Sequence, residues 1–439
     1  MFAVALLIYY VGSTIYFWNR LRHVPGPLMA GISSLWEMSV IATGQEPWVY
    51  NDLANKHGHL IRISPNTILT DDPEVLRRIS GVRKSYVKDA FYTGSIKHPD
   101  HDTMFSTIDT PAHDAIKAKL AGAYSGRETL AMEPIVDDLI EALIQHIRDE
   151  VSAGWDRKGV VDFANTTNLF TMDVISRVSF GRELGFLRTH SDVHGLMAAI
   201  RDKHWKKQSR SDASKGAFIR SGLSQGECLS EALFSMVAGS DTTASAIRAT
   251  MLYLITTPHV YQKLKQVVIE AVHSGRVSSP IKQEEAKEIP YLQAIIYEGL
   301  RMRPPVPIKL YKVVPHPGDE IDGKFIPGGT AIGWNQIPMM RSTQHWGHDA
   351  DVFRPERFSD AYEETRMSME RLVELAFGHG RFGCAGKPLA FMELSKVYFE
   401  LFRHFDFQVV NPMKPWNSML FSVWMDDNFL VQVTEAGLN

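Results

Sequence analysis

The stretch from Phe377 to Ala390, Phe-Gly-His-Gly-Arg-Phe-Gly-Cys-Ala-Gly-Lys-Pro-Leu-Ala, is the most informative part of the chain. Three glycines precede Cys384 within six residues, and Gly386 follows it. Glycines at this density permit a tight loop and a close approach of the backbone to a large group. The apolar run from Pro388 to Phe402 predicts a helix. Cys384 therefore lies just before a helix N-terminus, where the helix dipole and exposed N–H groups favour a thiolate.

Cys384 has one structural interpretation and three functional ones. A lone cysteine is most often a buried structural residue, but the surrounding glycines disfavour that interpretation here. Cys384 could be a nucleophile, which needs a base that the sequence does not locate, or a metal ligand, or a haem axial ligand. Cys228 is the only other cysteine. A four-cysteine zinc site and a disulfide-rich secreted fold are therefore excluded, and we expect the body of the chain in a reducing compartment.

The composition is that of a globular protein. The chain has 439 residues, of which 44% are hydrophobic and 22% are charged. This composition excludes a disordered or collagen-like chain, and length alone favours two or three domains. The formal net charge is −3, from 47 basic and 50 acidic residues, so no overall basic field points to nucleic acid.

The N-terminus departs from this globular pattern. The 17 residues from Phe2 to Trp18 contain no charged residue, and Arg20 and Arg22 follow directly before Val24-Pro25-Gly26-Pro27. An apolar run of this length is at the short limit for a transmembrane helix, and the basic residues place its C-terminal side in the cytoplasm. We expect residues 1–22 to be an uncleaved membrane anchor. A cleaved signal peptide and a buried helix are the alternatives.

Glu227 to Thr257 is the longest predicted helix, and its apolar composition predicts that it is buried. It contains the segment Ala238-Gly239-Ser240-Asp241-Thr242-Thr243. Glycine costs about 1 kcal/mol inside a helix, and Asp and Thr compete for backbone hydrogen bonds. The segment therefore indicates either a functional site or a polar notch where two helices cross.

Glu298 and Arg301 share one face of a helix predicted to begin at Pro290. A surface ion pair of little energetic value is the default interpretation. The chain has four such Glu-x-x-Arg pairs, at Glu74/Arg77, Glu298/Arg301, Glu363/Arg366 and Glu400/Arg403. Further helices are predicted at Glu133–Val151 and Thr166–Phe180, and strands at Leu60–Thr70 and between Lys309 and Trp334.

Four segments, in this order along the chain, resemble the haem-thiolate monooxygenases of the cytochrome P-450 superfamily. Ala238–Thr243 resembles the oxygen-activation motif, and Glu298 with Arg301 resembles the helix-K pair. Arg357, in Phe-Arg-Pro-Glu-Arg-Phe, resembles the arginine that completes that pair, and Phe377–Gly386 resembles the cysteine loop. The resemblance implies a mainly α fold with small β-sheets over residues 23–439. The overall sequence pattern is most similar to that of fungal family members that act in secondary metabolism, such as the pisatin-demethylase-like group.

The resemblance also implies a role for each matching residue. Cys384 would bind the iron of haem b as a thiolate, which favours O–O cleavage. Asp241 and Thr242 would relay protons to the place where oxygen is activated. The remaining residues would hold the cofactor or the fold around it: Phe377, Gly380, Arg381, Gly386, His113 and Lys117 at the haem, and Glu298, Arg301 and Arg357 as a structural network beneath it.

Two features depart from the family pattern. Phe382 stands two residues before Cys384, where the family usually has Arg or His, so the contact of Arg381 with a haem propionate is in question. Only 56 residues separate Gly181 from Ala238, where the family fits two long helices over the active site. Residues 182–226 therefore predict a shortened lid and an unusually open pocket above the haem.

The resulting expectation is a membrane-bound monooxygenase at the endoplasmic reticulum. It would insert one oxygen atom from O2 into an apolar small molecule, with electrons from NADPH through a flavin-containing cytochrome reductase. A truncated, non-catalytic haem protein, a haem-thiolate isomerase or dehydratase, and more distantly a cysteine hydrolase are the alternatives. Four segments are expected to line the pocket: Tyr86–Phe105, the helix around Ala238, Val306–Leu310 and Trp416–Val423.

Overall fold

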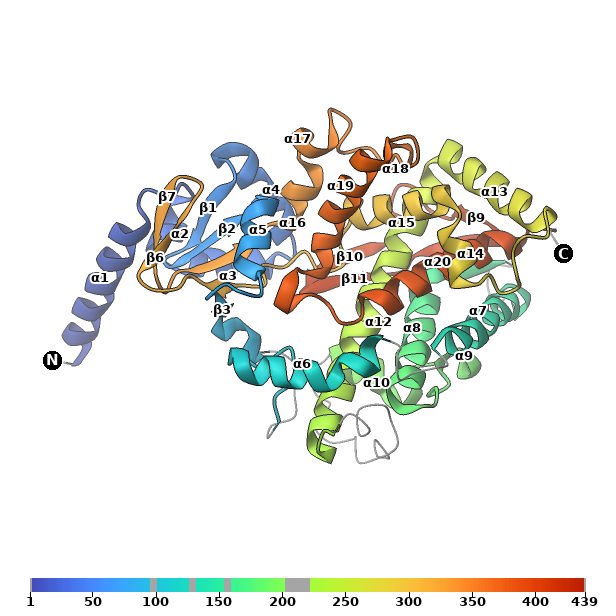
Figure 1. The fold of residues 1–439 in the computed structure, drawn as a ribbon, viewed down its shortest axis with the longest axis horizontal. Helices are drawn as coiled ribbons and strands as arrows, with labels where there is room; N and C mark the ends of the chain where they lie inside the picture. Colours follow the sequence, from blue (N-terminus) through green and yellow to red (C-terminus); the bar gives the residue numbers. More distant parts are fainter. Residues whose placement is uncertain (1, 95–100, 126–131, 154–158, 202–221, 438–439) are drawn as a thin grey trace.

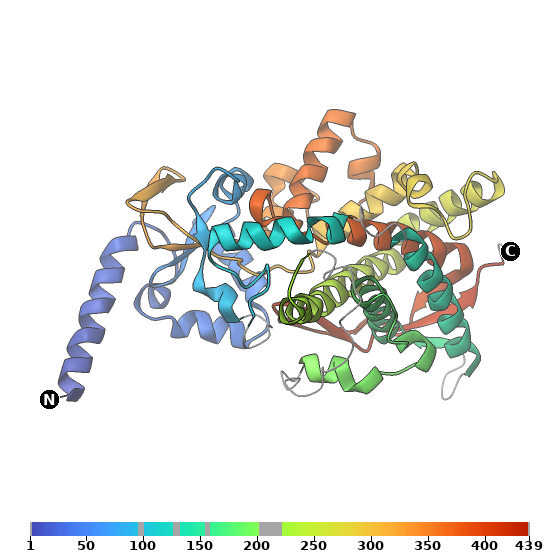
Figure 2. The same ribbon diagram turned by 60° about the horizontal axis from the view of Figure 1, so that its bottom comes forward.

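The structure is a computed structural model, and it describes residues 2–94, 101–125, 132–153, 159–201 and 222–437. A smaller part built around β-sheet lies on the N-terminal side, and a larger helical part follows it (Figures 1 and 2). The expected mainly α fold with small sheets is confirmed.

Helices form most of the described chain. The longer ones are α6 (Thr110–Ser125), α7 (Met132–Ala153), α8 (Phe163–Phe180), α12 (Gln225–Thr256), α13 (Pro258–His273), α15 (Pro290–Met302), α19 (Glu363–Val373) and α20 (Lys387–His404). The shorter ones are α2 (Leu28–Ile32), α3 (Leu35–Ala42), α4 (Glu46–His57), α5 (Pro73–Ser80), α9 (Phe186–Thr189), α10 (Leu196–Arg201), α14 (Gln283–Lys287), α16 (Gln336–Arg341), α17 (Thr343–Trp346) and α18 (Glu356–Ser359).

The strands form small sheets. A five-stranded sheet has the order β1-β2-β8-β5-β3, and its pairs are antiparallel except β2 with β8. A three-stranded sheet has the order β4-β12-β9, and β6-β7 and β10-β11 are hairpins. The strands are β1 (Leu60–Ser64), β2 (Thr67–Thr70), β3 (Val87–Lys88), β4 (Val160–Asp162), β5 (Lys312–Val313), β6 (Gly318–Ile321), β7 (Lys324–Pro327), β8 (Ala331–Trp334), β9 (Phe405–Val409), β10 (Asn417–Phe421), β11 (Val423–Asp427) and β12 (Leu430–Glu435).

Helix α12 runs through the middle of the helical part (Figure 1). Its 32 residues begin with a capping box, in which Ser224 and Glu227 satisfy each other's backbone N–H groups, and they end before Pro258. The helix continues unbroken through the polar segment at 238–243. A Cβ added at Gly239 would lie 2.7 Å from the Cδ1 atom of Ile175 in α8, so this glycine allows two helices to pack closely.

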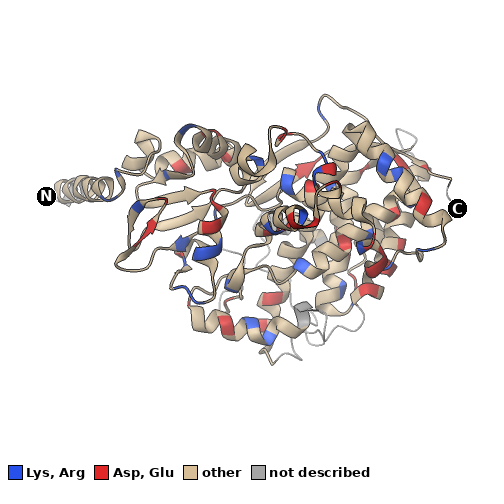
Figure 3. Ribbon diagram, turned by 45° about the horizontal axis from the view of Figure 1, so that its top comes forward, with Lys and Arg blue, Asp and Glu red and all other residues tan. Residues whose placement is uncertain are grey.

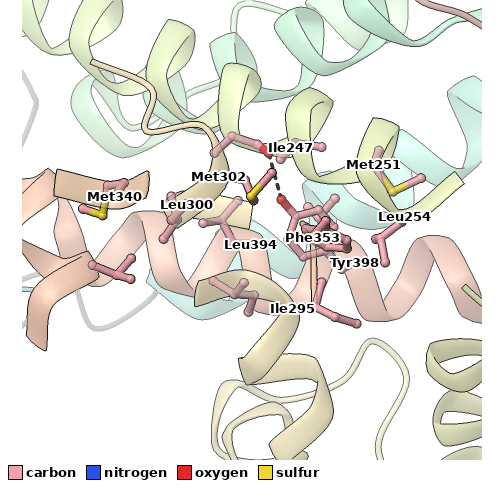
Figure 4. Packing of buried hydrophobic residues seen from close by; sticks show 14 of the residues in the cluster. Ile247, Met251, Leu254, Ile295, Leu300, Met302, Met340, Phe353, Leu394 and Tyr398 are labelled. Carbon is pink, nitrogen blue, oxygen red and sulfur yellow. Dashed lines mark hydrogen bonds between the residues drawn. The ribbon is translucent and has the colours of Figure 1, made fainter. Parts of the chain in front are cut away.

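The main core lies between α12, α15 and α20. Figure 4 shows Ile247 and Met251 of α12 facing Ile295 of α15 and Leu394 of α20. The hydroxyl of Tyr398 in α20 donates to the Ala246 carbonyl at 3.1 Å, which satisfies the one polar group of that side chain in the core. The three helices therefore form a rigid support for the loop that precedes α20.

Helix α1 (Phe2–Leu21) projects away from the body in both views (Figures 1 and 2). Its described contacts with the body lie in the last turn: Leu21 is fully buried, Arg62 donates to the Phe17 carbonyl at 3.1 Å, and Arg20 donates to the Gly328 carbonyl at 2.7 Å. The part before these contacts spans about 22 Å, less than the roughly 30 Å hydrocarbon core of a bilayer. Among the described helices none is both long and apolar enough to cross a membrane, so the transmembrane helix expected at residues 1–22 is not found.

The region between α8 and α12 contains little regular structure among the described residues. Only α9, a 3-10 turn at Val193–Gly195 and α10 are present there, and residues 202–221 lie outside the described part of the chain. The shortened lid expected at 182–226 therefore stays a prediction. Acidic and basic residues are interspersed on the body (Figure 3), in keeping with the near-balanced net charge.

Candidate active site

A large cavity of about 1430 Å³ lies between α12 and the loop before α20. Pockets for drug-sized ligands usually measure about 300–1,000 Å³, so this cavity has room for more than one small molecule. Its lining includes described residues from all four expected segments, namely Lys88, Phe91, Tyr92, Gly94, Met104, Phe105, Val237, Ala238, Val306, Ile308, Leu310, Leu420, Phe421 and Val423. Within the first segment, residues 95–100 lie outside the described part.

The Cys384 side chain opens into this cavity. Cys384 is exposed and is one of the residues that line the cavity. The Cys384 N–H donates to the Phe377 carbonyl at 2.6 Å, which closes the loop, and the Phe377 ring also lines the cavity. Gly380 has a φ of +57°, and a Cβ there would lie 2.5 Å from the Ser80 carbonyl oxygen. The loop course therefore requires glycine at Gly380, as expected.

The surroundings of the Cys384 sulfur combine burial with positive charge. Burial raises the pKa of the Cys384 thiol, while the backbone N–H groups of Gly386 and Lys387 and the ammonium of Lys117 oppose that rise. These N–H groups belong to the start of α20, as the sequence predicted. Gly386 has an ordinary φ of −81°, so the backbone does not require glycine there. A Cβ at Gly386 would sit 3.8 Å from the sulfur, and its absence leaves room beside that atom.

Two buried lysines that the sequence did not reveal lie side by side near the cavity: Lys88 lines it, whereas Lys312 is not among the lining residues. Lys88 in β3 and Lys312 in β5 are direct partners across the two strands, and each side chain is only 4% exposed. Among the described residues, no carboxylate lies within ion-pair distance of either, although Glu231 and Asp114 act on Lys88 from farther away. Burial lowers the pKa of Lys88 to about 7, and burial followed by Lys88 itself holds the pKa of Lys312 well below its usual range.

Keeping both buried lysines charged costs free energy in the protein without cofactor. Lys88 Nζ donates to the Met104 and Phe105 carbonyls, both at 2.9 Å, and Lys312 Nζ donates to the Tyr92 hydroxyl at 3.3 Å, so both amines have acceptors. Like charges directly opposite each other in a sheet repel, so the pair favours the neutral form of at least one amine. The Lys312 ammonium lies 3.5 Å from the centre of the Phe382 ring, and the Lys88 ammonium lies 5.7 Å from it. Phe382 therefore packs against both amines, in the position where the family usually has Arg or His. An anionic group bound beside Lys88, which lines the cavity, would favour the charged forms of these amines.

The other residues expected at the cofactor are close by, with one exception. His113 and Lys117 of α6 line the cavity, and Lys117 donates to the Arg381 and Gly383 carbonyls at 2.6 and 3.3 Å. Burial, followed by Lys88, lowers the pKa of His113 to about 4, so its ring is neutral at pH 7. Arg381 does not line the cavity, because its guanidinium pairs with Asp114 at 3.1 Å.

Asp241 and Thr242 of α12 both line the cavity and are both partly exposed to it. The Thr242 hydroxyl donates to the Ala238 carbonyl at 2.8 Å within the helix. The helix-crossing interpretation is therefore confirmed at Gly239, and the functional-site interpretation stays a prediction for Asp241 and Thr242. Gly239 serves the crossing of α12 with α8, whereas Asp241 and Thr242 face the cavity.

A buried acid on α20 was missed by the sequence analysis. Glu393 lines the cavity and is 3% exposed. Burial raises its pKa to about 8, against the hydrogen bond with Thr243 of α12, so the carboxyl is mostly protonated at pH 7. Glu393 is nine residues after Cys384 in an amphipathic helix, and nothing local distinguishes it from a surface glutamate.

Glu298, Arg301 and Arg357 form one buried network, as expected. Arg301 binds both Glu298 oxygens, at 2.7 and 2.8 Å, and Arg357 Nε donates to the same carboxylate at 3.1 Å. Arg357 also donates to Asp349 at 3.2 Å. Burial opposes ionisation of Asp349, but hydrogen bonds from Arg354 and Arg357 lower its pKa to about 2. Asp349 is a further member of the network that the sequence did not identify.

Comparison with known proteins identifies relatives along nearly the whole chain. The family model described as Cytochrome P450 matches residues 25–203 and 199–433. The cytochrome P450 monooxygenase aba1 of Botryotinia fuckeliana is 40% identical, covering 95% of this chain and 92% of its own. The cytochrome P450 monooxygenase ABA1 of Pyricularia oryzae is 38% identical, covering 98% and 96%. Pisatin demethylase of Fusarium vanettenii is 28% identical, covering 92% and 86%.

Proposed function

The chain belongs to the cytochrome P450 family, and from that membership we propose that it inserts one oxygen atom from O2 into an apolar small molecule in fungal secondary metabolism. It is an oxidoreductase of the monooxygenase class, and haem is the cofactor of this family. The observation that carries the proposal is the joint position of Cys384, Asp241 and Thr242 on the walls of one large cavity.

The residues present fit a haem. Cys384 would bind the iron, because its sulfur faces the cavity beside the N–H groups that start α20. Lys88 would contact a propionate, since it is a buried amine on the cavity wall, and Lys312 is its direct neighbour across the two strands. His113 and Lys117 line the same region. When bound, the haem supplies the activation of dioxygen.

The reaction also needs protons. One oxygen atom enters the substrate and the other leaves as water, which takes two electrons and two protons. Asp241 and Thr242 would deliver those protons from α12, because they are the acid and the hydroxyl exposed to the cavity on that helix segment. The electrons would come from NADPH through a flavin-containing cytochrome reductase. The apolar lining around Phe91, Phe105 and Leu420 favours an apolar substrate.

A shortened lid is part of the proposal. The two stretches matched by the family model meet at residues 199–203, between α8 and α12, which supports a loss of family sequence at that point. A lid excludes water from the cavity. We propose that the loss of the lid leaves the pocket open to water. A smaller fraction of the electrons from NADPH would then end in product. The same observation favours a second candidate function, a haem-binding relative without useful activity.

Attachment to a membrane is a further part of the proposal. Several apolar side chains of α1 are exposed, among them Val4, Ile8, Val11 and Ile15. They would lie in the bilayer surface while the body stays on the cytoplasmic side of the endoplasmic reticulum. Deleting residues 2–16 should move the protein from the membrane fraction to the supernatant with its haem retained. Retention on membranes after a salt wash would contradict this attachment.

The experiment that tests the haem site is a reduced carbon-monoxide difference spectrum. The wild-type chain should show the thiolate-type band, and Cys384→Ala should lose it. Cys228→Ala is the matched control, because Cys228 is buried at the start of α12 and does not line the cavity. A thiolate-type band in Cys384→Ala would overturn the assignment. Substrate-dependent NADPH consumption with product formation then separates the monooxygenase from the inactive relative.

A further inference from the structure

Two imidazoles and a carboxylate gather at a second place, away from the cavity. His146 and Glu150 are one helical turn apart on α7, and His190 directly follows α9. One possible ligand atom from each of the three residues lies within 4.8 Å of the other two. None of them lines the cavity. We propose that His146, Glu150 and His190 form a binding site for a divalent transition-metal ion, with Zn²⁺ as the best match.

The ligand set matches zinc chemistry. Two histidines and one glutamate with an open fourth position for water are a known zinc arrangement, with bonds of about 2.0–2.2 Å. The His190 Nδ1 already lies 2.9 Å from the Glu150 carboxylate, and the two imidazole rings stack with centres 4.3 Å apart. Asp149 lies 3.9 Å from the His190 ring and adds a second negative charge at the site. Closing around an ion requires side-chain movements of about 1–2 Å, since ligand atoms of a tetrahedral site are roughly 3.3 Å apart.

A supporting hydrogen bond fixes the chemistry of His146. Its Nδ1 lies 3.2 Å from the Leu187 carbonyl, which can only accept, so Nδ1 must carry the proton. The neutral ring then has its lone pair on Nε2. Histidine ligands of metals characteristically donate their other ring N–H to such a carbonyl, which orients the ring.

The loop that carries His190 is also held in place before any ion arrives. The buried Asp173 carboxylate accepts three successive backbone N–H groups of residues 185–187, at 2.8, 3.0 and 2.9 Å. His190 has a φ of +51°, a left-handed conformation that non-glycine residues adopt infrequently. Asp173 thus fixes both the carbonyl that orients His146 and the turn that presents His190.

The position of the site suggests what the ion would do. It would join the C-terminal half of α7 to the segment that leaves α8 and leads toward α12. His146 is 3% exposed, whereas the side chains of His190 and Glu150 are 34% and 40% exposed, so an ion can enter from solvent. The alternative is an ordinary Glu150–His190 ion pair that needs no metal.

Equilibrium dialysis of the haem-loaded protein against Zn²⁺ at pH 7.5, with elemental analysis, distinguishes a zinc site from a metal-free ion pair. We expect one zinc per chain at micromolar concentration or below. His190→Asn removes the imidazole and keeps a residue that tolerates the left-handed backbone. It and Glu150→Gln should each weaken binding at least tenfold. His273→Asn, at an exposed histidine ending α13, should bind zinc like the wild type.

Two results would overturn the proposal. One is a wild-type protein that binds zinc no more tightly than His190→Asn. The other is an X-ray absorption spectrum at the zinc edge, which haem iron does not disturb, that shows no imidazole ligands. The proposal does not depend on the monooxygenase function. The carbon-monoxide spectrum should be the same in His190→Asn and Glu150→Gln as in the wild type, so that loss of zinc and loss of haem are distinguished.

Discussion

Glu298→Gln should destabilise the protein far more than Glu74→Gln, although both glutamates begin a Glu-x-x-Arg pair. Glu298 and its partner Arg301 are 0% exposed, whereas the Glu74 side chain is 78% exposed. Both glutamates bind the arginine three residues later. The two substitutions therefore compare a buried and an exposed copy of one sequence pattern.

The hydrogen bonds of Glu298 set the expected magnitude. One oxygen accepts from Arg301, from Arg357 and from the Arg354 backbone N–H at 2.8, 3.1 and 2.8 Å, and the other accepts from Arg301 at 2.7 Å. A glutamine keeps one accepting oxygen and turns an NH2 group toward an arginine donor. The buried guanidinium groups also lose their counter-charge. Breaking a buried ion pair in this way costs about 3–5 kcal/mol, and removing an exposed pair costs about 0–1 kcal/mol.

Urea unfolding followed by haem absorbance and circular dichroism measures this difference. With a slope of about 3 kcal/mol per molar urea, Glu298→Gln should lower the midpoint by about 1 M or more and Glu74→Gln by less than about 0.3 M. Equal shifts would refute the reasoning. Where Glu298→Gln is not recovered folded, Arg357→Lys gives a graded measurement, because it keeps the charge and loses part of the hydrogen bonding.

Three further results are expected. Thr242→Ala should keep haem but divert electrons from product to peroxide, which is measured as NADPH consumed per product formed. Thr256→Ala is the control, because it removes a similar intrahelical hydrogen bond at the exposed end of α12, and it should leave that ratio unchanged. Lys88→Met should speed haem transfer to apomyoglobin at least several-fold, and Lys324→Met, at a partly exposed lysine that pairs with Asp322 and does not line the cavity, should not. Burial raises the pKa of Glu393 to about 8, so the wild type loses stability as pH rises from about 4.5 to about 8. Glu393→Gln should lack that loss. The free energy of unfolding of Glu393→Gln, measured in urea, should therefore rise relative to that of the wild type by up to about 1.4 kcal/mol per pH unit over this range. Equal pH profiles of the two proteins would contradict this.

Features that depend on residues close together in the sequence were predictable. The cysteine loop, the start of α20 and the length of α12 follow from glycine density, apolar periodicity and a terminal proline. The juxtaposition of Glu298, Arg301 and Arg357 was also expected, but only through the family resemblance. Local spacing alone favoured a weak surface pair at all four Glu-x-x-Arg positions. The structure buries Glu400/Arg403 as well, and Arg366 pairs with Glu370 instead of Glu363.

Features that depend on long-range pairing were not predictable from local patterns. Lys88 and Lys312 carry no motif, and they meet only because β3 pairs with β5. Glu393 becomes a neutral buried acid only because α20 packs against α12. The apolar N-terminal run was correctly expected to form a helix. Its last turn packs onto the sheet-containing part, which shortens the free portion below the length that the sequence alone suggested.

The pairing of Lys88 with Lys312 has a consequence for the stability of newly made chains in the cell. Without cofactor, folding must bring two amines together in an apolar interior. Burial lowers the pKa of Lys88 to about 7, so holding this amine inside the folded chain reduces stability at pH 7. Newly made chains that meet no haem should spend more time unfolded and be degraded. The abundance of the enzyme would then follow the haem supply of the cell.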